Sequence, residues 1–166
     1  ALAMTLDTCK ALADEGFPLP VSFNASSEDL LNDAYIDLLL TLPDKKQVPA
    51  HLLEIEVTES MAMQNYDRIN PLLRLLINKG FNVSVDDFGT GYSSLSRITH
   101  LAATTLKIDK SFINVMDKNK DGEGITDIVL NIGRQFKYAV IAEGIETEAQ
   151  KDMLQSKGCE FGQGYY

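Results

Sequence analysis

Two acidic residues stand side by side in the middle of the sequence: Asp86 and Asp87 come just before the glycine-containing stretch Phe88–Tyr92. Two carboxylates this close repel each other, so each raises the pKa of its neighbour unless a cation lies between them. The pair therefore fits either a dyad that shares one proton or a metal site. A polar turn at a strand end is the third interpretation, because Asp and Gly are also common turn residues.

Further polar residues fall near the C-terminal ends of predicted strands. Apolar and polar residues alternate over 52–58, 81–85 and 105–109, which predicts strands with one apolar and one polar face. Residues 21–25 and 138–142 are expected to form two more strands. The polar side chains expected to converge at the ends of these strands are Asn24, Glu56, Asp86, Asp87, Lys107 and Glu143.

This set of residue types favours a site for hard cations. Carboxylate and amide oxygens without histidine or cysteine favour Mg²⁺, Mn²⁺ or Ca²⁺ over zinc. Two such ions could hold a phosphoryl oxygen and activate a water, and Lys107 could orient that water or neutralise developing charge. Any one of these residues could instead be a satisfied polar group in a barrel interior. Their convergence at one place favours the site.

The elements that carry these residues alternate between strand and helix about six times, with a last strand expected over 159–165. Such alternation predicts parallel β/α units. Strands of an open doubly wound sheet are usually apolar on both faces, whereas these have one polar face with functional residue types at its C-terminal end. We therefore expect an α/β fold of the TIM type, a (β/α) barrel. A complete barrel takes roughly 250 residues, so the 166 residues are expected to lack its first strands.

Composition narrows the function further. The net charge is −9 and Lys and Arg form no dense run, which argues against a partner that is a nucleic-acid polymer. No apolar run has the length of a membrane span, so direct membrane insertion is not expected. The two cysteines, Cys9 and Cys159, are far apart and form no Cys-x-x-Cys pair. Reduced thiols fit a cytoplasmic setting.

Several motifs of the chain occur together in one known family, and their order and spacing are specific. The chain resembles the EAL-domain family along essentially its whole length. The strand Val21–Ser26 is similar to the family's asparagine-bearing strand, with Phe23 and Ala25 as variants. The motifs that carry the resemblance are Glu56-Val57-Thr58-Glu59, Asp86-Asp87-Phe88-Gly89-Thr90-Gly91-Tyr92-Ser93-Ser94-Leu95, Lys107-Ile108-Asp109, Ala142-Glu143-Gly144-Ile145-Glu146-Thr147 and Gln163-Gly164-Tyr165.

The resemblance implies a modified TIM barrel that hydrolyses the bacterial second messenger cyclic di-GMP to linear pGpG with two Mg²⁺ or Mn²⁺ ions. It implies that Asn24, Glu56 and Asp86 ligate metal. Asp87 would bind or bridge to the second ion, and Asp109 would lie near that ion.

The remaining roles that the resemblance implies concern water, loop and substrate. Lys107 would help to position the attacking water, and Glu143 would act on it as a base or through the metal. Glu59 would hold the loop from Phe88 to Ser94, and Gln163 would lie near the substrate.

One departure from the family pattern concerns the Glu-Ala-Leu tripeptide that names it, which does not occur in the sequence. We therefore expect residues 1–166 to be part of an EAL domain whose first segment precedes Ala1, with impaired activity of the part alone. The resemblance also implies a homodimer, and sensor or diguanylate-cyclase-like domains in a parent chain that a membrane can tether. One rival function is a receptor that binds cyclic di-GMP without cleaving it. Another is a glycosidase-like barrel with paired carboxylates, but the adjacent Asp86 and Asp87 do not by themselves supply an acid and a base on opposite sides of a sugar bond.

Overall fold

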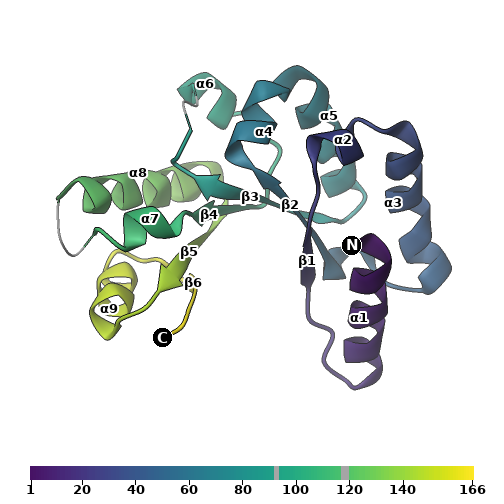
Figure 1. Ribbon diagram of the computed structural model, residues 1–166, viewed down its shortest axis with the longest axis horizontal. Coiled ribbons are helices and arrows are strands. Elements are labelled where there is room, and N and C mark those ends of the chain that lie inside the picture. Colours follow the sequence, from purple (N-terminus) through teal and green to yellow (C-terminus); the bar gives the residue numbers. More distant parts are fainter. Residues whose placement is uncertain (92–93, 117–119) are drawn as a thin grey trace.

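The architecture is a curled parallel sheet with helices on its outer side. The structure, a computed structural model, describes residues 1–91, 94–116 and 120–166. Its described part contains one sheet of six strands, ordered β1-β2-β3-β4-β5-β6, and every neighbouring pair is parallel. The sheet curves into a half barrel, with the helices on the convex side and β1 and β6 at its two ends (Figure 1). This arrangement confirms the predicted TIM-type barrel with about six β/α units.

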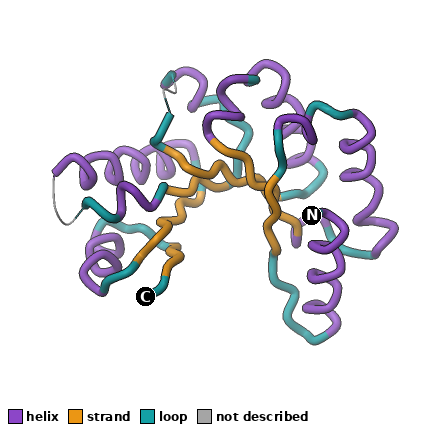
Figure 2. Tube along the Cα trace, in the orientation of Figure 1, coloured by secondary structure: helices purple, strands orange, loops and turns teal. Residues whose placement is uncertain are grey.

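The strands follow the chain in the order in which they lie in the sheet, and Figure 2 shows them as one continuous arc. Parallel neighbours require a crossover on the outer side after each strand, and the helices supply it. All C-terminal strand ends therefore meet at one edge of the sheet. The strands are β1 (Val21–Asn24), β2 (Leu53–Thr58), β3 (Asn82–Phe88), β4 (Thr105–Ile108), β5 (Ala139–Ile145) and β6 (Phe161–Gly164).

The long helices lie where the apolar periodicity predicts them, whereas two short helices directly after strands were not predicted. These two are α4, which begins at Glu59, and α7, which begins at Lys110. One turn or little more is too short for a 3.6-residue period to stand out. The helices are α1 (Leu2–Asp14), α2 (Ser27–Leu30), α3 (Asp33–Lys46), η1 (Ala50–Leu52), α4 (Glu59–Gln64), α5 (Tyr66–Asn78), α6 (Leu95–Ile98), α7 (Lys110–Ile113), α8 (Lys120–Phe136) and α9 (Glu148–Ser156).

The region after β1 differs from the single helix that its apolar stripe predicts. Ser26 with Asp29 three residues later is a capping-box pattern, and the box is present: the Asp29 N–H donates to Ser26 Oγ at 3.1 Å, and the Ser26 N–H donates to Asp29 Oδ2 at 3.0 Å. However, α2 is only four residues long, and a second cap at Asn32 begins α3. A proline inside a helical pattern is expected to end the helix, but Pro43 lies inside α3. The helix continues through Pro43 and ends where Gln47 turns left-handed at φ 59°.

The core lies between the convex face of the sheet and the helices. Ile55, Val83, Val85, Leu106 and Ile108 are fully buried there. The residues between them point to the concave face, so the predicted alternation of apolar and polar strand faces is present. No helix in the described ranges is both long enough and apolar enough to span a membrane.

Strands β3 and β5 extend further than the alternation predicts. Asp87 was expected at the start of a loop, but it lies inside β3, and Glu143 lies inside β5. The register between β3 and β4 shifts between Val85 and Phe88, and Asp87 has the positive φ of 54° at this irregularity. A bulge places two residues where a regular strand has one, so the strand continues past it. Asp86 thus pairs with Thr58 of β2, and Asp87 is held between the paired residues Val85 and Phe88 of the same strand and not by a turn alone.

Candidate active site

The ammonium group of Lys107 lies among three carboxylates on the concave face. Its Nζ is 2.7 Å from Glu143 Oε1, 3.2 Å from Glu56 Oε1 and 3.5 Å from Asp86 Oδ1. The lysine side chain is 9% exposed and the three carboxylates are 13% to 21% exposed. Water therefore screens these interactions weakly.

Sheet pairing explains why residues so distant in sequence meet. Strands β2, β3, β4 and β5 are consecutive neighbours. Because side chains alternate between the two faces of a strand, Glu56, Asp86, Lys107 and Glu143 all point to the concave face near the C-terminal strand ends. Catalytic side chains of (β/α) barrels lie at this edge. The structure thus brings together four of the six residues that were expected to converge.

The cluster changes the ionisation of its members. Burial lowers the pKa of Lys107, but the hydrogen bond to Glu143 and the charges of Glu56, Glu143 and Asp86 outweigh it, so the pKa is raised. Burial also raises the pKa of Glu143, an effect that Lys107 opposes and that Asp86 and Glu56 reinforce. Lys107 therefore stays positively charged, while Glu143 binds a proton more readily than an ordinary glutamate. A raised pKa suits a group that accepts a proton near neutral pH.

Asp87 and Asp109 form a second acidic group beside the first. Burial raises the pKa of Asp87, and the charges of Asp86 and Asp109 raise it further. Burial acts on Asp109 in the same direction, but hydrogen bonds from Ser111 lower its pKa below the ordinary value. The Ser111 N–H donates to Asp109 Oδ1 at 2.9 Å as the cap of α7. The pKa values of the two neighbouring carboxylates are thus shifted in opposite directions, upward for Asp87 and downward for Asp109.

Asn24 and Gln163 lie on strands next to those of the charged cluster. Asn24 pairs in register with Glu56 across β1 and β2, and Gln163 pairs with Glu143 across β5 and β6. Both residues are exposed. Each therefore has an amide at the concave edge that remains accessible to a ligand.

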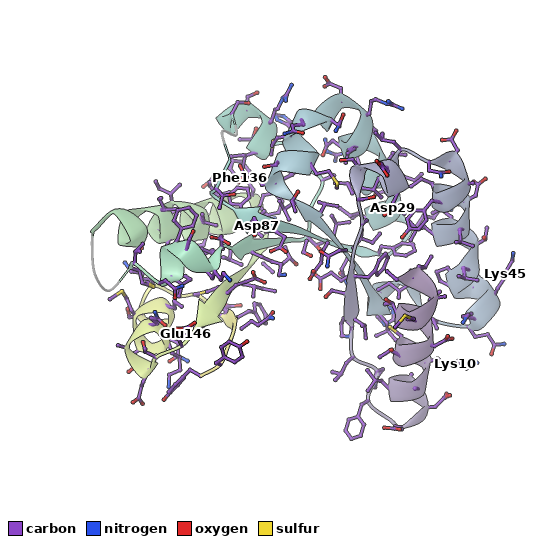
Figure 3. All side chains as sticks on the ribbon, in the orientation of Figure 1. Lys10, Asp29, Lys45, Asp87, Phe136 and Glu146 are labelled. Carbon is purple, nitrogen blue, oxygen red and sulfur yellow. The ribbon has the colours of Figure 1, made fainter. Side chains whose placement is uncertain are left out.

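A cleft of about 460 Å³ opens beside the cluster. Figure 3 labels two acidic residues of its lining, Asp87 at the end of β3 and Glu146 beyond β5. The sequence assigns no role to Lys110, Glu146 or Tyr165, although Glu146 and Tyr165 lie within family motifs and Lys110 directly follows one, and that position is the available signal. The lining consists of Asp87, Asp109, Lys110, Glu143, Gly144, Glu146, Gln163, Gly164 and Tyr165.

Glu59 contacts the loop after β3 instead of the charged cluster. Its side chain is buried, with 2% exposed, at the start of α4. Its Oε2 accepts the N–H of Gly89 at 2.8 Å and the N–H of Gly91 at 3.2 Å. The predicted contact to the loop is present as far as Gly91, while Tyr92 and Ser93 lie outside the described residues.

The donor set suits a hard divalent cation, but an ammonium group lies between the carboxylates. In the described ranges, no three His, Cys, Asp or Glu side chains are gathered closely enough to hold a metal ion by themselves. The donors that the family resemblance implies are an amide on β1 and carboxylates on β2, on β3 and directly after β4, which are the oxygen ligands that Mg²⁺ and Mn²⁺ take. The ammonium group of Lys107 is within ion-pair distance of both Glu56 and Asp86.

Several relatives and solved structures are similar to this chain in sequence and in fold. The signaling protein YkoW of Bacillus subtilis (strain 168) is 42% identical over 153 residues, which are 92% of this chain and 19% of YkoW. The cyclic di-GMP phosphodiesterase NbdA of Pseudomonas aeruginosa is 35% identical over 147 residues, 89% of this chain and 19% of NbdA. The chain thus spans about a fifth of the length of these relatives.

A solved structure of the PaMucR phosphodiesterase in complex with c-di-GMP has the same fold. It superimposes with a TM-score of 0.89 and is 33% identical, covering 97% of this chain and 65% of that one. The family model described as EAL domain matches residues 1–166, the whole of the sequence. Together with the half barrel and the acidic cluster on its concave edge, this match shows that the chain belongs to the EAL domain family.

Proposed function

We propose that this chain carries the active-site edge of a phosphodiesterase that hydrolyses cyclic di-GMP to linear pGpG. The observation that carries the proposal is the meeting of Lys107 with Glu56, Asp86 and Glu143 on the concave edge of an EAL-family fold. The name of NbdA and the ligand of the PaMucR structure support the choice of substrate.

The cation sites are assigned from the donors. Asn24, Glu56 and Asp86 hold one divalent ion, and Asp87 with Asp109 hold a second. Mg²⁺ or Mn²⁺ fits these oxygen donors. Such ions, when bound, supply the positive charge that a phosphodiester needs beside an edge of net negative charge.

The side chains of this chain handle the water and the proton. Glu143 accepts a proton from a water molecule as the oxygen of that water adds to phosphorus and one ester P–O bond breaks. The ester oxygen that is freed stays part of the linear product and takes up a proton from solvent. Its raised pKa and its place on the cleft wall support this role. Lys107 donates to Glu143 and thereby fixes the orientation of that carboxylate.

Substrate contacts and the loop complete the proposal. Gln163 offers its exposed amide to the substrate from the cleft lining, beside Glu143 on the neighbouring strand. Glu59 fixes the loop after β3 through Gly89 and Gly91, and this loop follows the aspartate pair directly. A displacement of this loop would therefore also displace Asp86 and Asp87.

The surroundings of the site are proposed as well. We propose that this chain is one module of a longer signalling protein, since the matched relatives are about five times as long as this chain. We also propose that the protein forms a homodimer. A cytoplasmic setting fits the free thiols of Cys9 and Cys159.

The test is conversion of cyclic di-GMP to pGpG, followed by chromatography, with Mg²⁺ or Mn²⁺ and with EDTA. Both the chain and a polypeptide extended upstream to include a Glu-Ala-Leu segment are assayed. We expect metal-dependent turnover of the extended polypeptide and loss of at least about a hundredfold in Glu143→Gln. Binding of cyclic di-GMP without turnover would instead identify a receptor, and unchanged turnover in Glu143→Gln would refute the assigned base.

A further inference from the structure

The position of Lys107 has a consequence for the metal-free protein. Its Nζ lies 2.7 to 3.5 Å from carboxylates of three different strands, β2, β3 and β5. Lys107 itself is on β4, where all four residues are buried. A single cation from the middle of the sheet therefore reaches three carboxylates, two of them on the strands that flank β4.

Three carboxylates so close together repel one another unless a cation lies among them. Because each is no more than 21% exposed, solvent screens the repulsion only partly. Removing one partner of a buried ion pair leaves uncompensated charge and costs more than the pair itself contributes. Lys107 therefore holds the concave face together when nothing else neutralises it.

The same carboxylates are those to which the proposed function assigns a divalent ion. Glu56 and Asp86 cannot serve the ammonium group and a metal ion fully at once, since two cations that share these oxygens repel each other. We propose that Lys107 is a built-in counter-cation, which keeps Glu56, Asp86 and Glu143 assembled in the metal-free protein and competes with the first divalent ion for them. This inference rests on the proposed function only for the choice of metal ligands.

The chemistry of a lysine suits such a role. Its ammonium group is a compact charge on a flexible four-carbon stem, so it can shift toward one partner while the others change ligand. Glu143 is the nearest partner, at 2.7 Å, and is not assigned to the first ion. Lys107 can therefore stay paired with Glu143 while it gives up Glu56 and Asp86.

The test compares Lys107→Met with Lys46→Met in the whole chain. Methionine keeps most of the length of the side chain and removes its charge. Lys46 is the matched control, because it forms an ion pair with Asp7 on the surface, away from the cluster. Two quantities are measured: the thermal unfolding midpoint in EDTA and with saturating Mn²⁺, and the Mn²⁺ dissociation constant by electron paramagnetic resonance.

In EDTA, we expect Lys107→Met to unfold roughly 6 °C below the unsubstituted chain and Lys46→Met to unfold near it. Saturating Mn²⁺ should close at least half of the gap for Lys107→Met. The same variant should bind Mn²⁺ about tenfold more tightly, because the competing charge is gone. An unchanged midpoint in EDTA, or Mn²⁺ affinity that is equal or weaker, overturns the inference.

A second variant covers the case in which Lys107→Met does not fold even with Mn²⁺. Lys107→Met combined with Glu143→Gln removes one positive and one negative charge together, so folding is expected to return. This double variant should bind Mn²⁺ more tightly than Glu143→Gln alone, and weaker or equal binding overturns the inference. Neither readout uses cyclic di-GMP. Tighter Mn²⁺ binding by Lys107→Met, together with no hydrolysis by the unsubstituted extended polypeptide, would therefore reject the proposed function and leave the counter-cation intact.

Discussion

The Oε2 atom of Glu59 lies 2.8 Å from the backbone nitrogen of Gly89, a residue 30 positions further along the chain. The same oxygen also accepts the N–H of Gly91. A buried carboxylate thus fixes the first residues after the strand that carries Asp86 and Asp87. Hydrogen bonds to a charged group are among the stronger ones in proteins.

The first prediction concerns this contact. Glu59→Ala leaves two backbone N–H groups without their acceptor, so the free energy of unfolding should fall by about 2 kcal/mol. Turnover of cyclic di-GMP should fall about a hundredfold, because a small displacement of site residues is costly. Urea unfolding and chromatography of pGpG measure the two effects. Glu160→Ala, at an exposed position, is the control, and equal behaviour of the two variants would contradict the anchoring role.

The second prediction concerns Gly144, which follows Glu143 and lines the cleft. It has a φ of +72°, and a Cβ atom there would lie 2.6 Å from Lys110 Cβ. Gly144→Ala should therefore lower the free energy of unfolding by about 2 to 4 kcal/mol, from backbone strain and steric overlap. Gly124→Ala is the matched control, since its Cβ meets nothing within 4 Å and its site is helical. The control should gain about 0.5 to 1 kcal/mol, and similar losses in both variants would argue against the close approach.

The third prediction concerns Gln150, a buried residue whose side chain bonds to the backbone of Glu146, which lines the cleft, and to that of Ile113 on α7. Its Oε1 accepts the N–H groups of Glu146 and Thr147 at 2.8 and 3.1 Å, and its Nε2 donates to the Ile113 carbonyl at 3.3 Å. Gln150→Ala should lower the free energy of unfolding by about 2 to 3 kcal/mol, because the backbone partners lose their bonds. Urea unfolding measures this loss. Gln155→Ala, exposed on the same helix, should change it by less than about 0.5 kcal/mol.

The fourth prediction concerns pH in the absence of metal. The pKa values of Glu143 and Asp87 are raised in the folded state, from ordinary values of 4.5 and 3.8. The folded protein therefore binds protons more tightly than the unfolded chain, and the contribution of these two groups to stability falls as the pH rises through their folded pKa values. Glu143→Gln should flatten that fall.

Metal should reverse this dependence, because carboxylates must be ionised to bind cations. The stabilisation that Mn²⁺ provides should therefore grow with pH over the same window. Unfolding midpoints measured from below the ordinary pKa values of 3.8 and 4.5 upward, in EDTA and in Mn²⁺, decide the matter. A stability in EDTA that rises with pH in the unsubstituted chain, with an equal slope in Glu143→Gln, would speak against the raised pKa values.

The sequence by itself determined the alternation of strands and helices, the polar and apolar faces of the strands, and the residues that belong to the family's motifs. These features are local: strand alternation has a period of two residues, and a cap such as Ser26 with Asp29 spans four. The barrel class followed from these features, because alternating strands and helices whose strands have one polar face have few ways to bury the apolar strand face.

Only the tertiary structure decided how the residues of the site relate to one another. Glu56 and Lys107 are 51 positions apart, and no local pattern states that Lys107 also reaches Asp86 and Glu143. The place of Asp87 inside β3 likewise depends on a register shift against the neighbouring strand. Such contacts arise from the pairing of the strands and the curvature of the whole sheet. These depend on many weak interactions between residues that are distant in sequence. The types of the residues could thus be predicted, whereas the central place of one lysine among three carboxylates could not.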